Sequence, residues 1–391
     1  MPVNKKIVNT CKTWILHSVY KGFSSLINNH VFNGKAVTEC DIRKVCSELE
    51  KKGYLYKDPF TRKLDLQTDN KYELSLLVPV YNNEKYLAEC LNSLIGQKTG
   101  HTYQIVIVND GSTDKSAAII ERYKGISNIA VFEQSNRGIS AARNKALELA
   151  SGKYIGFIDN DDIVSKHYVE HLINRITQTD ADIVKCGHRT ISDGRIVETS
   201  KLTDASYPGG LGSNIVKYNG YIWGGCYRRS LWNDICFPEG FWFEDMITRL
   251  LPYSICKKFE YLGEALYYKR DHETNASKVV WNRGIKRFDQ LFLLRSIIRK
   301  RKDIQIPMTE SHFGICMEEL GCFACSRLGI KDLYNSFVIS ADIVKEMRAE
   351  LGHEPEFSDG STWFLYESLK NGDYDAYRLW MIREKIKILM I

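Results

Sequence analysis

The sequence predicts an α/β protein built on a doubly wound sheet, with helical additions at both ends. From Leu74 to about residue 187, short apolar runs alternate with amphipathic stretches, which is the pattern of strands and helices in a parallel sheet. Polar and turn-forming residues directly follow several of the runs, as expected where strands end. We therefore expect three parts: a helical addition over 1–70, a sheet domain over 71–280 and a helical region over 281–391.

Five apolar runs are the predicted strands of this sheet: Leu74–Val80, Gln104–Val108, Ile129–Glu133, Tyr154–Ile158 and Ile183–Gly187. Right-handed crossovers between parallel strands place ligands at the carboxyl ends of the strands. The loops after Val80, Val108 and Ile158 are therefore expected to border one crevice.

Helices are expected between these strands. Behind Asn82 and Asn83, which are residue types that cap helix starts, apolar residues recur at helical spacing. A second helix is expected behind Asp114, and an alanine-rich third helix after Ser140.

The two ends of the chain carry amphipathic segments. The first segment places Trp14, Ile15, Val19, Phe23 and Ile27 on one helical face. The last places Leu379, Ile382, Ile386 and Leu389 on one face, with basic residues among the others. Such a basic end either packs as an ordinary terminal helix or lies on an anionic membrane surface, and both interpretations stay open.

Composition narrows the class of protein. With 391 residues, 44% of them hydrophobic, and a formal net charge of +6, the chain can bury a sizeable core. Long basic runs interleaved with aromatic residues are missing, so nucleic acid is not an expected partner. Eleven scattered cysteines fit a reducing compartment, and the C-x-x-C pair of Cys322 and Cys325 lacks the second pair of a zinc site. Without a signal-peptide pattern or a long apolar stretch, we expect a cytoplasmic protein with, at most, peripheral contact at the inner face of the membrane.

Four polar motifs follow the predicted strands in a fixed order: Leu77–Asn82, Ile107–Asp114, Asn136–Asn144 and Phe157–Asp162. In the second motif, a glycine permits a tight turn, and the carboxylate of Asp110 can accept a hydrogen bond from a ligand N–H. In the third motif, the planar guanidinium of Arg143 can pair with phosphate.

The fourth motif concentrates negative charge. Asp159, Asp161 and Asp162 lie on one short turn, where they would repel each other without a cation. Hard oxygen ligands of this kind suit Mg²⁺ or Mn²⁺, shared with the oxygens of a diphosphate.

Together these motifs closely resemble the family 2 glycosyltransferases, whose fold is called GT-A, over roughly residues 74 to 277. The resemblance implies a sheet that binds a nucleotide-diphosphate sugar. It assigns Asp110 to the base of the nucleotide, with Pro79, Val80 and Tyr81 lining the same pocket. It also puts a nucleotide contact at Arg143.

The acidic motif matches the D-x-D motif of this family. The resemblance places Asp159 and Asn160 near the ribose or sugar of the donor and assigns Asp161 to the metal, Mn²⁺ or Mg²⁺. The Lewis acidity of this ion would stabilise the leaving diphosphate. In the later stretch Tyr267–Ser277, which is similar to the end of the catalytic domain in relatives, His272 is expected to complete the metal shell or touch phosphate.

Two further segments carry the resemblance to the acceptor side. Ile222–Leu231 resembles the segment that lines this side, with Trp223 in it. Phe243–Met246 resembles the E-D motif, which places Glu244 on the acceptor side and makes Asp245 the catalytic base. Apolar walls around such a carboxylate raise its proton affinity, which suits deprotonation of a hydroxyl.

An aromatic group accompanies these segments. Its members are Trp223, Trp232, Phe241, Trp242 and Phe243. They are expected to form either a wall on which sugars stack or part of the ordinary core.

The resemblance thus implies a metal-dependent, inverting hexosyl- or N-acetylhexosaminyl-transferase. Its donor is expected to be a UDP-sugar, and its acceptor a glycan or lipid-linked saccharide in bacterial surface polysaccharide or capsule synthesis. The alternative is a nucleotide-sugar-binding scaffold protein without turnover. A pyrophosphorylase is disfavoured because the loop Tyr81–Glu84 has no glycines or basic residue, and a dehydrogenase because no G-x-G-x-x-G follows the first strand.

Overall fold

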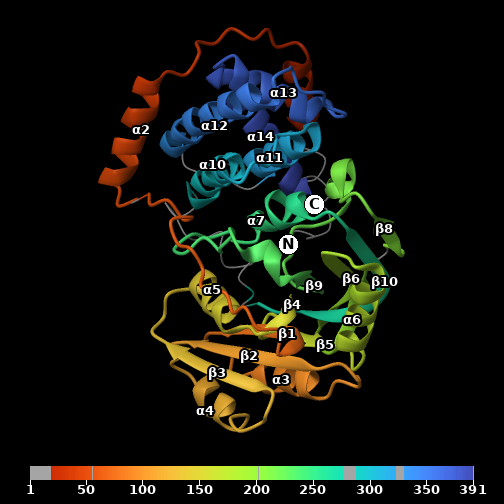
Figure 1. Cartoon of the computed structure of the whole chain (residues 1–391). Coiled ribbons are helices and arrows are strands. Elements are labelled where there is room, and N and C mark those ends of the chain that lie inside the picture. The colour runs from red at the N-terminus through yellow and green to blue at the C-terminus, as the bar shows by residue number, and fades with distance from the viewer. Residues whose placement is uncertain are drawn as a thin grey trace, which may run out of the picture. The chain divides into compact units, whose positions relative to one another are not determined.

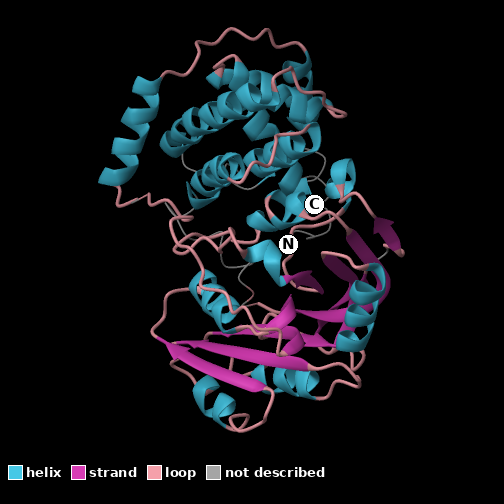
Figure 2. Cartoon of the chain, in the orientation of Figure 1, coloured by secondary structure: helices cyan, strands magenta, loops and turns pink. Residues whose placement is uncertain are grey.

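The computed structural model describes residues 19–54, 56–200, 202–273, 275, 288–322 and 330–390. The chain divides into two compact units. One, the α/β unit, comprises Asp58–Val280 and Arg299–Ile306, and the other, the helical unit, comprises Met1–Lys57, Trp281–Ile298 and Pro307–Ile391. Every strand in the described residues belongs to the α/β unit, as the magenta arrows of Figure 2 show.

The α/β unit is built on one mixed sheet. Its strands are β1 (Tyr72–Val80), β2 (Tyr103–Asp110), β3 (Ile129–Gln134), β4 (Gly152–Phe157), β5 (Ile163–Val164), β6 (Ile183–Ser192), β7 (Arg195–Thr199), β8 (Ala205–Tyr207), β9 (Gly225–Arg228) and β10 (Phe259–Asp271). Their order is β3-β2-β1-β4-β9-β6-β10-β5, with β7 paired to β6 and β8 to β10. The predicted α/β class with a nucleotide-binding sheet is confirmed.

The five predicted strands run in the same direction, but the sequence did not predict the antiparallel strand β9 that lies between two of them. The strands β1 to β4 are parallel, but β9 pairs antiparallel with both β4 and β6, so the run Ile183–Gly187 is separated from β4. The close approach of β9 to β6 requires glycine at position 225, where a Cβ atom would lie 2.3 Å from the carbonyl oxygen of Val184.

The first four strands are central and buried. All residues of β1 from Leu74 to Val80 are buried, as expected for a parallel strand covered on both faces. The strand order reverses between β1 and β4, which is the position where ligands bind in open α/β sheets. In the register, Val80 faces Asn109 and Leu77 faces Phe157, so the ends of β1, β2 and β4 lie at one edge.

Helices cover both faces of this sheet. They are α3 (Leu87–Ile95), α4 (Ser116–Glu121), α5 (Ile139–Leu149), α6 (Tyr168–Thr179), α7 (Met246–Leu250) and α8 (Pro252–Ile255), with 3₁₀ turns η1 (Gly212–Lys217) and η2 (Arg229–Trp232). Figure 1 shows α3 and α4 on one face of β1 to β3 and α5 on the other.

The asparagines after β1 do not cap α3 as expected. Tyr86 is the N-cap residue of this helix and makes no side-chain capping bond. Asn82 instead adopts a left-handed backbone conformation (φ 47°), and its Oδ1 accepts a hydrogen bond from Thr113 N at 2.7 Å. Asn82 therefore ties the end of β1 to the loop after β2, and Asn83 ties it to Asn160 after β4. Helical periodicity in the sequence does not reveal such long-range contacts.

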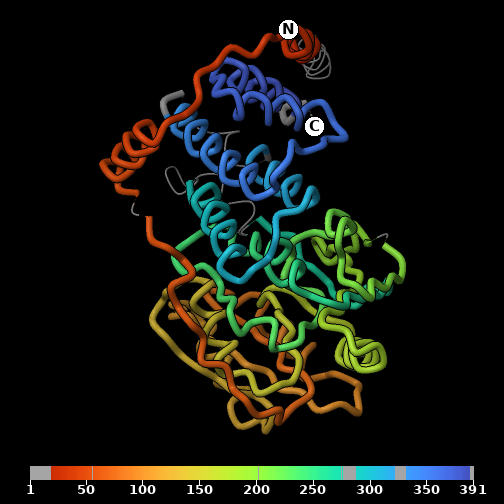
Figure 3. The backbone as a smooth tube through the Cα atoms, turned by 45° about the horizontal axis from the view of Figure 1, so that its top comes forward, coloured from red at the N-terminus to blue at the C-terminus, as the bar shows by residue number. Residues whose placement is uncertain are grey.

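The helical unit contains no strand in its described residues. Residues 19–28 are helical, followed by α2 (Glu39–Lys51), α10 (Phe288–Asp303, in this unit as far as residue 298), α11 (Glu310–Cys322), α12 (Ile330–Leu351), α13 (Gly360–Lys370) and α14 (Tyr374–Met390). Figure 3 shows the N-terminal segment, in red, running beside the C-terminal helices, in blue. His30 Nε2 lies 2.8 Å from Asp373 Oδ2 and fixes this contact. Trp14, Ile15 and Cys325 lie outside the described residues.

The terminal helix α14 buries only part of the apolar face that the sequence predicts: Ile386 is buried and Leu379 is half-buried, and the side chain of Leu389 lies outside the described residues. Trp380 and Met381 are buried, whereas Ile382 of the predicted apolar face is 37% exposed. The Trp380 indole donates a hydrogen bond to Ser361 O at 2.9 Å, which anchors α14 against α13. These contacts support the packed-helix interpretation, and contact with a membrane stays a prediction. Within the described helices, none combines the length and the apolar character needed to span a bilayer.

We expect Gly225→Ala to destabilise the α/β unit. The new methyl group must push β9 away from β6, which costs about 2 kcal/mol or more in the free energy of unfolding. Chemical denaturation measures this change. Gly100→Ala is the matched control, because a Cβ atom there meets nothing within 4 Å, and equal stability of the two variants would contradict the close approach of the strands.

Candidate active site

The structure brings the first and fourth motifs together at the switch point of the sheet. The amide of Asn160 donates a hydrogen bond to Pro79 O at 2.7 Å, and the Asn83 amide donates to Asn160 Oδ1. Val80 is buried in the core, whereas Tyr81 is 48% exposed. Of these β1-end residues, Tyr81 therefore has the aromatic surface available for a base to stack on.

Asp110, at the end of β2, is engaged by the protein itself. Its carboxylate accepts hydrogen bonds from Gln134 Nε2, Arg137 N and Gly138 N at 2.8 to 2.9 Å. It is buried and holds the loop that leads into α5. Its role in binding the nucleotide base stays a prediction.

The three carboxylates of the acidic turn have different environments. Asp162 is buried and accepts hydrogen bonds from the Tyr267 hydroxyl at 2.8 Å and from Arg270 N at 2.7 Å. It is a structural residue of the turn. Asp159 and Asp161 are partly exposed and are the two carboxylates that a cation can reach.

Asp161 lies against His272, as the shared metal assignment requires. His272 Nε2 is 3.0 Å from Asp161 Oδ2, and the Asn275 amide is 3.4 Å from the same oxygen. Burial raises the pKa of Asp161, the charge of Asp159 raises it further, and His272 opposes the shift.

This pair alone does not form a complete metal site. Among the described residues, no group of three or more histidine, cysteine or acidic side chains is arranged to hold an ion. The carboxylate and imidazole fit Mn²⁺ or Mg²⁺ only if oxygens of a bound diphosphate complete the coordination.

Arg143 occupies the centre of the site. Its side chain is 1% exposed, and its guanidinium donates to Asp159 Oδ1 at 3.1 Å, Glu244 Oε1 at 3.0 Å and Asp245 Oδ1 at 2.9 Å. Burial lowers the pKa of Arg143, but the three carboxylates outweigh this effect and raise it. Arg143 thus joins the acidic turn to the E-D pair, which lies about a hundred residues further along the chain. Its predicted nucleotide contact stays a prediction.

Asp245 combines access with a raised proton affinity. Burial raises the pKa of Asp245 to about 7, with Arg143 opposing the shift and the charges of Glu244 and Asp159 adding to it. The side chain keeps 34% of its surface exposed, so a hydroxyl can reach it. Although Asp245 precedes α7, its side chain makes no capping hydrogen bond. An ordinary helix-capping role is therefore not supported.

The backbone next to this pair is strained. Phe243 has a φ of 66°, a left-handed conformation that aromatic residues rarely adopt. Strain of this kind persists where the surroundings over-determine it, as the contacts of Glu244 and Asp245 with Arg143 do here.

Trp223 belongs to an aromatic stack, and its place on the acceptor side stays a prediction. Its ring centroid lies 4.6 Å from that of Tyr221 and 4.6 Å from that of Tyr267, with interplanar angles of 14° and 15°. The Tyr267 hydroxyl bonds Asp162 and accepts a hydrogen bond from Asp159 N at 3.2 Å. The stack therefore ends on the acidic turn.

Not every predicted aromatic residue lies in such a wall. Trp232 is fully buried and stacks on Phe237 with centroids 5.2 Å apart, so it is a core residue. Sequence reasoning cannot separate the two uses, because aromatic residues are typical of both cores and sugar sites.

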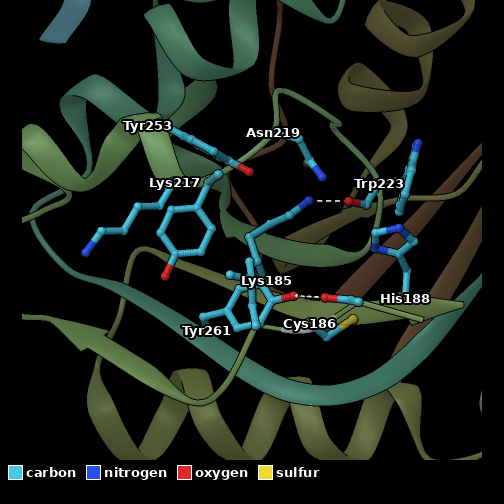
Figure 4. A pocket seen from close by; sticks show the side chains of 11 residues that line it. Lys185, Cys186, His188, Lys217, Asn219, Trp223, Tyr253 and Tyr261 are labelled. Carbon is cyan, nitrogen blue, oxygen red and sulfur yellow. Dashed lines mark hydrogen bonds between the residues drawn. The ribbon is translucent and has the colours of Figure 1, made fainter. Parts of the chain in front are cut away.

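Lys185 was missed by the sequence analysis. It lies inside the apolar run of β6, and its buried ammonium donates to Tyr221 O at 3.0 Å and to Trp223 O. Figure 4 shows this side chain reaching the Trp223 segment. The sequence does carry a signal for this residue, because Lys185 is the one charged residue in the apolar run Ile183–Gly187. Lysine is almost never buried without a specific partner, so its position indicates a buried contact.

Known proteins share this sheet and its motifs. Residues 75–227 match the family model described as Glycosyl transferase family 2. The "Uncharacterized glycosyltransferase EpsJ" of Bacillus subtilis is 30% identical over 267 residues, which cover 64% of this chain and 74% of that protein. The "Putative glycosyltransferase EpsH" of the same organism is 30% identical over 319 residues, which cover 72% of this chain and 87% of that protein.

A solved structure extends the similarity to three dimensions. It is the structure of residues 1–349 of Staphylococcus aureus TarS in complex with UDP-GlcNAc, which has 25% sequence identity and a TM-score of 0.66. The superposition covers 80% of this chain and 91% of that chain. Full-length TarS, described as a poly(ribitol-phosphate) beta-N-acetylglucosaminyltransferase, is matched over 38% of its length. The motifs, the sheet and these similarities lead to one conclusion: the chain belongs to glycosyltransferase family 2 and has the GT-A fold.

Proposed function

We propose that the protein transfers a sugar from a UDP-sugar to a hydroxyl of a cell-surface polymer or its lipid-linked precursor, with inversion at the anomeric carbon. The observation that carries this proposal is the ion-pair cluster of Arg143, which holds the E-D pair beside the acidic turn. The relatives support the substrate class, because TarS is solved with UDP-GlcNAc and is named for transfer to poly(ribitol-phosphate).

In the proposed mechanism, the donor lies across the ends of β1, β2 and β4. Tyr81 stacks on the base, and Asp159 and Asn160 contact the ribose or sugar. Asp161 and His272 would hold Mn²⁺ or Mg²⁺ together with the diphosphate, and a bound ion supplies charge stabilisation to the leaving group.

The reacting hydroxyl is oriented by the E-D pair. Asp245 accepts its proton as the acceptor oxygen bonds to the anomeric carbon and the bond from that carbon to the diphosphate oxygen breaks. One displacement from the opposite face inverts the configuration. Arg143 holds the carboxylate in place and keeps part of it ionised near neutral pH, which a general base requires.

We expect cation-dependent nucleotide binding that requires Asp161. Titration calorimetry with UDP, with and without Mn²⁺, should show binding that needs the ion, and Asp161→Ala should weaken it at least about tenfold because a coordinating oxygen is lost. Asp65→Ala, an exposed acid outside the site, is the control. Equal UDP binding by the Asp161→Ala and Asp65→Ala variants would contradict the assignment of Asp161 to the metal. Binding of UDP-sugar without turnover in the unmodified protein would favour the scaffold alternative.

We expect Asp245→Asn to reduce kcat by about a hundredfold or more while leaving UDP binding intact, because the general base is lost. Glu244→Gln is the matched variant, since Glu244 shares the contact with Arg143 but does not take the proton. Similar losses in both variants would mean that the pair acts only by holding Arg143.

The pH profile should report the raised pKa of Asp245. Because the base works in its ionised form, kcat/KM should rise with pH through a midpoint near 7. Arg143→Gln removes the charge that opposes the shift and should move the midpoint to higher pH, whereas Arg143→Lys keeps the charge and should move it less. If the midpoint is unchanged in a folded Arg143→Gln variant, the observed titration belongs to a group other than Asp245.

A further inference from the structure

A small pocket lies beside the Trp223 segment, within the α/β unit. Its volume is about 60 Å³, whereas a cavity of about 150 Å³ is needed for a ring such as benzene. Eleven side chains line it, among them Lys185, His188, Lys217 and Tyr253, and none of the eleven is acidic. The pocket therefore suits one small, electron-rich group and is too small for a sugar ring.

The pocket contains a buried cation that makes no direct contact with a carboxylate among the described residues. Lys185 is 5% exposed, and its Nζ donates to carbonyl groups of residues 221–223 and lies 3.4 Å from the Tyr227 hydroxyl. These partners are neutral, and no carboxylate within the described residues pairs with this ammonium. Burial lowers the pKa of Lys185 to about 8, and the charge of Asp245 opposes this shift without outweighing it.

Further donors surround the pocket and lack an acceptor. The Tyr253 side chain is 1% exposed, and its hydroxyl interacts with the Tyr227 hydroxyl but makes no hydrogen bond of ordinary length to a described residue. The neighbouring Tyr227 hydroxyl donates to Ile222 O at 2.9 Å instead. In Figure 4 the Tyr253 hydroxyl points toward the Lys185 ammonium and the Asn219 amide. A buried hydroxyl without a partner costs free energy, which a ligand oxygen would recover.

Charges of both signs act on His188. Burial lowers the pKa of His188, Glu198 opposes this effect, and the charges of Lys269 and Lys185 lower it further. His188 also packs edge-on against Trp223, with ring centroids 5.2 Å apart. The histidine can therefore report on any anion that enters the pocket, because an added negative charge must raise its pKa.

The pocket adjoins the proposed catalytic base. A Cβ atom at Gly220 would lie 3.5 Å from the carbonyl oxygen of Asp245, so the segment that borders the pocket also borders the E-D pair. A group bound here belongs to the acceptor, since the donor contacts are at the ends of β1, β2 and β4.

We propose that this pocket binds a phosphoryl oxyanion carried by the acceptor, next to the hydroxyl that receives the sugar. The inference rests on the proposed function for the position of the acceptor. A tetrahedral phosphoryl group fits the small volume and presents oxygens to the side chains of Tyr253, Asn219 and His188, while the ammonium of Lys185, whose N–H groups are donated to carbonyl oxygens, supplies positive charge beside it. Lys217 is an exposed cation at the rim, where it assists the approach of the anion.

The first experiment titrates the full-length protein with inorganic phosphate at constant ionic strength and follows the histidine resonances by NMR, with His188→Gln to assign His188. We expect a saturable rise in the pKa of His188. Acetate, a planar anion, should bind more weakly. A His188 pKa that is unchanged at the highest phosphate concentration would overturn the proposal.

A pair of tyrosine variants separates binding from folding. Tyr253→Phe should weaken phosphate binding about tenfold, since it removes a hydrogen bond to a charged group, and should not lower the unfolding midpoint. Tyr103→Phe removes a hydroxyl that donates to Leu94 O at 3.0 Å, away from the pocket. It should lower the unfolding midpoint and leave phosphate binding unchanged. The opposite pattern contradicts a ligand-binding role for Tyr253.

Transfer assays identify the source of the phosphoryl group. The acceptors are a polyol-phosphate chain, a polyprenyl-diphosphate-linked saccharide and an uncharged oligosaccharide. Lys217→Gln should raise KM for one of the two anionic acceptors, whereas Lys166→Gln, an exposed lysine outside the pocket, should not. Equal use of the uncharged acceptor would overturn the proposal. Normal UDP binding in that case would show that the donor site is intact and that only the acceptor inference has failed.

Discussion

The site depends on one buried charge, the guanidinium of Arg143. A buried arginine is tolerated when carboxylates neutralise its charge, and removing one partner of a buried pair costs about 3–5 kcal/mol. Here the partners are Asp159 from the acidic turn and the pair Glu244 and Asp245. The same contacts hold the strained backbone of Phe243. The requirement to neutralise a single cation therefore sets the separation between the acidic turn and the carboxylate of Asp245.

The two halves of the mixed sheet contribute different residues to the site. The parallel strands β1 to β4 are buried on both faces and present three strand ends at the switch point. The second half, in which β9 lies between β4 and β6, brings in the segment of Trp223 and the strand of Tyr267. The buried parallel strands thus hold the proposed donor contacts, and the antiparallel insertion supplies the residues proposed for the acceptor side.

The sequence predicted the parallel half well, because each strand is a local apolar run and each motif is at a strand end. The runs begin and end within two residues of β1 to β4. It could not predict the insertion of β9, since only four residues form this strand and glycine 225 is chosen for its lack of a side chain. The roles of individual side chains were harder still. Arg143 meets residues about a hundred positions away, and no local pattern separates a phosphate ligand from a buried ion-pair centre.

The Tyr267 side chain uses both its face and its hydroxyl. The ring completes the stack with Trp223 and Tyr221, and the oxygen bonds two residues of the acidic turn. A substitution in the stack is therefore expected to shift this oxygen and to disturb the acidic turn as well. If the proposed donor and acceptor roles hold, acceptor preference can diverge in evolution without loss of donor binding only at positions outside the stack, such as Lys217, because the stacked residues serve both substrates.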